Sequence, residues 1–124
     1  MNFKTWKRLD LATCFGLWAT IEAVTQAELE IGSGDAHRTA VIVGTALDGF
    51  PQSLLFHNRI PRYGPARAMP HFTLYSPDAC ASYVAVELGI RRVSMSISRG
   101  CSSSAQAIAL GFDLLQLKWA DTVL

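Results

Sequence analysis

The sequence predicts an α/β fold in which helices cover a small parallel or mixed sheet. Thr39–Thr45 is a continuous run of small and β-branched residues. Such a run is typical of a strand that is buried on both faces. The segment Val93–Asp113 first alternates with a period of two and then changes to a helical period, which predicts a strand that leads directly into a helix. Together these two segments indicate layered helices and strands.

Composition sets the outer bounds of function. The chain has 124 residues, of which 50% are hydrophobic, so we expect one domain with a real core. A net charge of +1 without a basic run gives no argument for a nucleic-acid partner. Cys14, Cys80 and Cys101 are widely spaced and form no CxxC pair, so neither a zinc site nor a disulfide framework is indicated. We expect no metal, and a reducing cytoplasm is the simplest location.

The N-terminal quarter predicts a helix from about Thr5 to Glu30, with Thr5 as its cap. Basic residues precede the apolar stretch Leu11–Ala19, an order that a signal peptide shares. That stretch is short and interrupted, however, and no apolar run reaches the roughly 18 residues of a membrane span. A membrane protein is therefore not expected. The glycines and serine of Ile31–His37 predict a loop.

The middle of the chain contains the buried strand Thr39–Thr45 and then a turn over Gly44–Gly49. The turn lacks the glycine patterns of nucleotide-binding loops, so no such cofactor is expected. We predict a short helix over Phe50–Asn58 and a long irregular loop over Arg59–Tyr75, which contains three prolines. The arginines of this loop fit an acidic or phosphate-bearing partner, although a plain solvated loop is the simpler interpretation.

The C-terminal half predicts a helix, a strand, a second helix and the start of another strand. Ser76-Pro77-Asp78 is a favourable helix start, with Ser76 as the cap and Pro77 at the first helical position. This helix is expected to end near Gly89. The strand Val93–Ser98, a helix to about Lys118 and a strand from Thr122 follow.

Cys101 lies where the strand turns into the helix, directly after Gly100. The first N–H groups of a helix have no intrahelical partners, and the helix dipole makes this end positive. Both effects favour the thiolate, which is the nucleophilic form of cysteine. The same N–H groups can hold an oxyanion that develops on a thioester carbonyl. The alternative is a buried structural cysteine before a serine-rich cap.

These residues resemble a known motif. Gly100–Ser104, followed by Ala107-Ile108, is similar to the nucleophile motif of the β-ketoacyl synthases, the condensing enzymes of fatty-acid and polyketide assembly. The family usually carries Gly-Pro where this chain has Arg92-Val93, and alanine where it has Gly100. The likeness extends from about Lys4 to the end of the chain and is carried outside the motif by Arg38–Thr45, Asp48-Gly49, Ser76–Ile90 and Lys118–Leu124.

The resemblance implies a thiolase-like layered fold, of which residues 1–124 form a single partial N-terminal domain. It also implies that Cys101 accepts an acyl group from an acyl carrier protein or acyl-CoA thioester. In the family, two histidines and a lysine from the second half support decarboxylation and condensation. His37, His57 and His71 all precede Cys101 and are expected on loops or the surface. This chain alone is therefore expected to acylate itself but not to condense.

A non-catalytic function is the alternative. The chain would then be a truncated module that interacts or forms a homodimer through the edge strand Val93–Ser98, which the resemblance places at the family's dimer interface. A thiolase or another member of the superfamily would share the cysteine, but the Ser102–Ser104 run favours a β-ketoacyl synthase over these. A sheet that ends at Leu124 is also expected to leave one edge and one apolar face uncovered.

Overall fold

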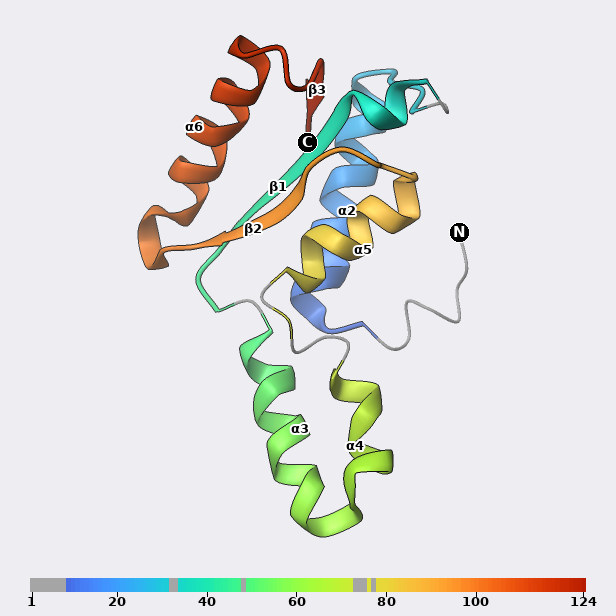
Figure 1. Cartoon of the computed structure of the whole chain (residues 1–124), viewed down its shortest axis with the longest axis vertical. Coiled ribbons are helices and arrows are strands. Elements are labelled where there is room, and N and C mark those ends of the chain that lie inside the picture. The colour runs from blue at the N-terminus through green and yellow to red at the C-terminus, as the bar shows by residue number, and fades with distance from the viewer. Residues whose placement is uncertain (1–8, 32–33, 48, 73–75, 77) are drawn as a thin grey trace.

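The computed structural model describes residues 9–31, 34–47, 49–72, 76 and 78–124. The sheet is covered on both faces by helices (Figure 1). Helices α2 (Leu11–Gln26) and α5 (Ala79–Leu88) pack together on one face, and α6 (Ser103–Gln116) lies on the other. This layered α/β arrangement is the predicted fold class.

The described sheet has three strands in the order β2-β1-β3. The central strand β1 spans Thr39–Thr45, with β2 (Ser94–Ser98) on one side and β3 (Thr122–Val123) on the other. Both neighbours run parallel to β1, so the described sheet is parallel. The central position of β1 explains its β-branched sequence, because both of its faces are covered by helices.

The core lies on both faces of β1. Val41 is 1% exposed and faces α2 and α5. Ala40 and Ile42 point to the opposite face and pack with residues of α6, as the alternation of a strand requires. The central strand thus fixes the position of α6, the helix that follows Cys101.

The N-terminal helix is shorter than predicted. The Thr13 N–H donates to the Asp10 carboxylate over 2.9 Å, so Asp10 is the N-cap of α2. Thr5, the expected cap, lies outside the described residues. The helix ends at Gln26 rather than Glu30, and Glu28 has a left-handed φ of 52°. A short 3₁₀ turn, Asp35–His37, precedes β1.

The prediction of an irregular loop over residues 59–72 is wrong. Helix α3 runs over Phe50–Tyr63, and α4 covers Pro65–Phe72. Gly64, with φ 77°, connects the two helices. Pro65 stands at the first position of α4, where a missing N–H breaks no helical hydrogen bond. The ring centroids of Phe56 and Phe72 lie 5.4 Å apart, and this contact joins α3 to α4 in a hairpin.

The C-terminal elements follow the prediction closely. Helix α5 ends at Leu88, and its C-cap, Gly89, has the left-handed φ of 69° that favours glycine. The helix begins two residues later than predicted, since Asp78 and not Ser76 is the N-cap of α5. The Ser76 hydroxyl accepts from the Asp78 N–H over 3.3 Å just before the helix, whereas Pro77 lies outside the described residues. Helix α6 ends at Gln116, close to the predicted Lys118. Among the described helices, none combines the length and hydropathy needed to span a membrane.

Candidate functional site

Cys101 lies at the junction between β2 and α6. A single 3₁₀ turn, Gly100–Ser102, connects the strand to the helix, and α6 begins at Ser103 (Figure 1). Gly100 has a left-handed φ of 58°, which a residue with a side chain rarely adopts. Cys101 is exposed. The structure therefore places Cys101 at the predicted strand-to-helix turn, where the residue is exposed in this chain and not buried.

Two serine side chains bind the backbone of this turn. The Ser103 hydroxyl accepts from the Arg99 N–H and donates to the Gly100 carbonyl, both over 2.8 Å. The Ser102 hydroxyl donates to the Arg99 carbonyl over 3.1 Å and accepts from Gln106. Ser103 is 3% exposed, whereas Ser102 is exposed. Hydrogen bonds from one buried serine and one exposed serine thus hold the backbone that carries Cys101.

The strand β1 packs unusually closely against the start of α6. A Cβ atom on Gly44 would lie 2.7 Å from the Ser104 N and Cα atoms and 2.8 Å from the Ser103 carbonyl carbon. Only glycine fits here, because the contacted atoms are backbone and cannot rotate away. The sequence predicted Gly44 where the strand Thr39–Thr45 meets the turn Gly44–Gly49, and it did not predict this contact. The available signal was a glycine inside a β-branched strand, which often marks a close backbone approach.

The entry to β2 has its own anchors. The Arg92 Nε–H donates to the Trp119 carbonyl over 2.9 Å, and the Arg92 guanidinium lies 5.7 Å from the Trp119 ring centroid. The Val93 carbonyl accepts from the Val41 N–H over 2.8 Å. Arg92 and Val93 replace the Gly-Pro usual in the family. Here they connect the strand that leads to Cys101 with Trp119, which follows α6, and with β1.

The other candidate residues lie away from Cys101. Cys80 is buried in α5, and Cys14 is half-buried in α2. Burial raises the pKa of Cys14, and the Asp10 carboxylate adds to this effect. His37 precedes β1, at the end of the parallel sheet opposite to Cys101. Across the described part of the chain, no three side chains of the metal-binding types come together.

His57 is exposed on α3, and its ring centroid lies 5.5 Å from the ring centroid of Phe56. The side chain of His71 lies outside the described residues. The structure therefore supplies no contact between Cys101 and a histidine among the described side chains.

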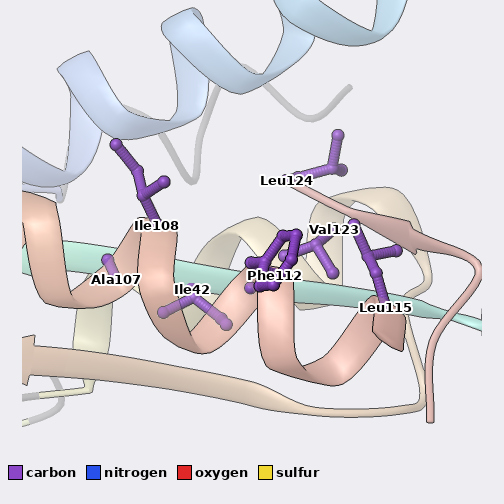
Figure 2. A pocket seen from close by; sticks show the side chains of 8 residues that line it. Ile42, Ala107, Ile108, Phe112, Leu115, Val123 and Leu124 are labelled. Carbon is purple, nitrogen blue, oxygen red and sulfur yellow. The ribbon is translucent and has the colours of Figure 1, made fainter. Parts of the chain in front are cut away.

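Helix α6 also carries an open apolar groove of about 320 Å³ (Figure 2). Ile108 and Phe112 are 75% and 59% exposed beside it. An uncovered apolar face was expected, and it lies along the helix that begins beside Cys101. The remaining lining comes from α6 itself, from β1, from β3 and from the last residue of the chain: Ala107, Gly111, Leu115, Ile42, Val123 and Leu124.

Comparison with known proteins identifies the family of the chain. The sequence model of the family described as "Beta-ketoacyl synthase, N-terminal domain" matches residues 1–124. The chain therefore belongs to the β-ketoacyl synthase family, and its layered fold is the thiolase-like fold of that family.

Two curated relatives illustrate the extent of the similarity. The chain is 27% identical over 119 residues to a 3-oxoacyl-[acyl-carrier-protein] synthase 2 of Staphylococcus aureus, covering 95% of this chain and 30% of that relative. It is 28% identical over 112 residues to the enzyme of that name from Vibrio harveyi, covering 87% of this chain and 26% of the relative. The chain thus spans less than a third of the length of these relatives.

Proposed function

We propose that this chain provides the acyl-accepting site of a fatty-acid condensing enzyme, with Cys101 as the nucleophile. The observation that carries the proposal is the exposed Cys101 thiol on a hydrogen-bonded turn at the start of α6, in a chain of the β-ketoacyl synthase family. The names of the relatives support an acyl carrier protein as the donor of the acyl group. An acyl-CoA offers the same thioester chemistry.

The reaction is a thioester exchange. The Cys101 thiolate attacks the carbonyl carbon of the acyl thioester and forms a tetrahedral intermediate with a negative oxygen. N–H groups at the start of the helix are suited to hold this oxygen, because they are oriented along the positive end of the helix dipole. The bond to the carrier sulfur then breaks, and the carrier leaves as a thiolate that takes up the proton lost by the cysteine. The product is an acyl-Cys101 thioester.

The proposal covers acyl transfer and not condensation. Condensation requires decarboxylation of a malonyl unit, for which the family uses histidines of its second half. His37 lies at the opposite end of the sheet from Cys101, and the described side chains offer no histidine in contact with the thiol. We therefore expect the chain by itself to stop at the acyl-enzyme.

Incubation with an acyl-CoA or acyl carrier protein, followed by intact mass measurement, tests this proposal. We expect one acyl group per chain in the wild type and none in Cys101→Ala. The matched control is Cys14→Ala, which should acylate normally because burial already disfavours the Cys14 thiolate. An acyl group retained in Cys101→Ala would overturn the assignment of the nucleophile.

Pairing of two copies through β2 is the second candidate function. The strand lies at the edge of the described sheet. Since the Val93 carbonyl bonds to β1, the alternation of a parallel ladder directs the backbone groups of Ser94, Ser96 and Ser98 away from the sheet. These N–H and C=O groups can form hydrogen bonds with a strand of a second copy.

One contact opposes this pairing. Asp78 stands at the N-cap of α5, yet its carboxylate accepts from the Ser96 N–H over 2.7 Å instead of capping its own helix. A pairing strand must displace this carboxylate. We therefore expect Asp78→Ala to dimerise at lower concentration than the wild type in light scattering after size exclusion. Asp78→Asn, which keeps an acceptor oxygen, is the matched control. Clean monomers at high concentration for wild type and Asp78→Ala would contradict pairing.

A further inference from the structure

We infer that Ser103 is a positioning residue for acyl transfer, holding the turn in which Cys101 lies so that its thiol and its N–H meet the same carbonyl. The inference rests on the proposed function of Cys101 and adds to it. Ser103 touches neither the substrate nor the thiol in this account. It acts through the backbone of Arg99 and Gly100.

The Ser103 hydroxyl uses both of its hydrogen-bonding capacities on the turn. It accepts from the Arg99 N–H and donates to the Gly100 carbonyl, each over 2.8 Å. These two groups flank the peptide bond between Arg99 and Gly100, just before Cys101. A hydroxyl can serve a donor and an acceptor at once, so alanine would leave both of these backbone groups without their side-chain partner.

Burial separates Ser103 from its neighbours in the serine run. Ser103 is 3% exposed, whereas Ser102 and Ser104 are exposed. The close packing of Gly44 against the Ser103 carbonyl carbon fixes Ser103 from the side of β1. The Ser103 hydroxyl therefore connects the closely packed start of α6 to a turn in which Gly100 has a left-handed φ of 58°.

Acyl transfer depends on this positioning more than simple thiol chemistry does. Attack on a thioester requires the sulfur and an N–H donor in fixed positions around one carbonyl, and small displacements of such groups slow the reaction strongly. Alkylation by iodoacetamide requires only an accessible thiolate. The ratio of the two rates at Cys101 therefore reports positioning and not the mere presence of a folded chain.

The experiment measures both rates at Cys101 in the wild type, Ser103→Ala and Ser104→Ala. Acylation is measured with an acyl-CoA and alkylation with iodoacetamide, each localised by peptide mass spectrometry. In Ser103→Ala we expect acylation to fall about tenfold or more and alkylation to change by less than about threefold. Ser104→Ala, which removes an exposed hydroxyl from the first turn of α6, should retain both rates.

Two further readouts keep the inference testable. The buried Cys80 thiol should remain unreactive to iodoacetamide, and its alkylation would show that a variant has unfolded. In that event Ser103→Thr, which keeps the hydroxyl, takes the place of the alanine variant, and it should retain the wild-type ratio of the rates. Acylation and alkylation that fall by the same factor in folded Ser103→Ala, unchanged acylation in that variant, or a lost ratio in folded Ser103→Thr would overturn the inference.

Amide exchange at Arg99 separates this inference from the proposed function. Removal of the Ser103 hydroxyl should accelerate exchange of the Arg99 N–H, since that group loses its acceptor. If the wild type takes up no acyl group, the proposed function fails and the exchange measurement alone decides whether Ser103 holds the turn. An Arg99 amide that exchanges equally fast in wild type and Ser103→Ala shows that it does not.

Discussion

The junction of β1, β2 and α6 and the α3–α4 hairpin are built in different ways. At the junction, the backbone of β1 touches the backbone of α6 so closely that Gly44 admits no side chain. In the hairpin, α3 has no buried residue, and Leu54 and Tyr63 are each 54% exposed. Substitutions at the junction should therefore change both the packing of the core and the position of Cys101. Substitutions in the hairpin should stay local.

The largest expected difference compares two glycines. Gly44→Ala forces backbone atoms apart at the junction and should lower the free energy of unfolding by about 3 kcal/mol, because overpacking without room to relax is costly. Gly64→Ala meets no atom within 4 Å and should cost only the backbone strain of its φ of 77° and ψ of 165°, about 1 to 2 kcal/mol. Urea unfolding measures both values. Equal losses at the two positions would contradict the distinction between the regions.

A second pair of substitutions compares the side chains. Val41 is 1% exposed in β1, and Val41→Ala should lower the free energy of unfolding by about 2 kcal/mol through lost burial and the cavity left behind. Leu54→Ala in α3 removes a larger but 54% exposed side chain and should change stability by less than about 0.5 kcal/mol. Thermal unfolding of the two variants side by side would sharpen the comparison. A greater loss from Leu54→Ala would reverse it.

The smallest effect concerns pH. The Arg38 side chain forms two hydrogen bonds with the Asp121 carboxylate and joins the start of β1 to the segment before β3. The hydrogen bond from Arg38 is the main cause that lowers the pKa of Asp121. A lowered pKa in the folded state stabilises the fold above the ordinary Asp pKa, and this contribution is lost as pH falls through the folded-state value.

The stability difference between wild type and Asp121→Asn should therefore shrink from neutral to acidic pH. It should be small throughout, because both partners are exposed. The α3–α4 hairpin should make no such contribution to the pH dependence of stability, since α3 and α4 contain arginines but no Asp or Glu. A difference that grows on acidification would contradict the sign of this linkage.

Sequence patterns predicted the junction better than the hairpin for physical reasons. The bounds of β1 follow from its β-branched run, and the turn at Cys101 follows from a change of period after a glycine. The sequence predicted a helix over Phe50–Asn58, the first part of α3, but the rest of the hairpin was missed because prolines were interpreted as breaks. Pro65 in fact begins a helix, where its missing N–H is harmless, and Pro61 is tolerated near the end of α3.

Other features of the site could not be derived from local sequence. Three adjacent serines follow Cys101, and only the path of the turn decides that Ser103 is the buried one that bonds to Arg99 and Gly100. The close approach of Gly44 to Ser104 depends on how β1 packs against a helix far along the chain. Local patterns indicate elements, whereas such contacts arise only when distant elements pack together.

The most direct test of the account is the site and chemistry of the acyl adduct. After reaction of the wild type with an acyl-CoA or acyl carrier protein, peptide mapping should locate a single acyl group on Cys101, and hydroxylamine should remove it because the bond is a thioester. The adduct should be absent from Cys101→Ala and weaker in Gly44→Ala than in Gly64→Ala. An adduct on Cys14 or Cys80 in place of Cys101, or no adduct in the wild type, would contradict the account.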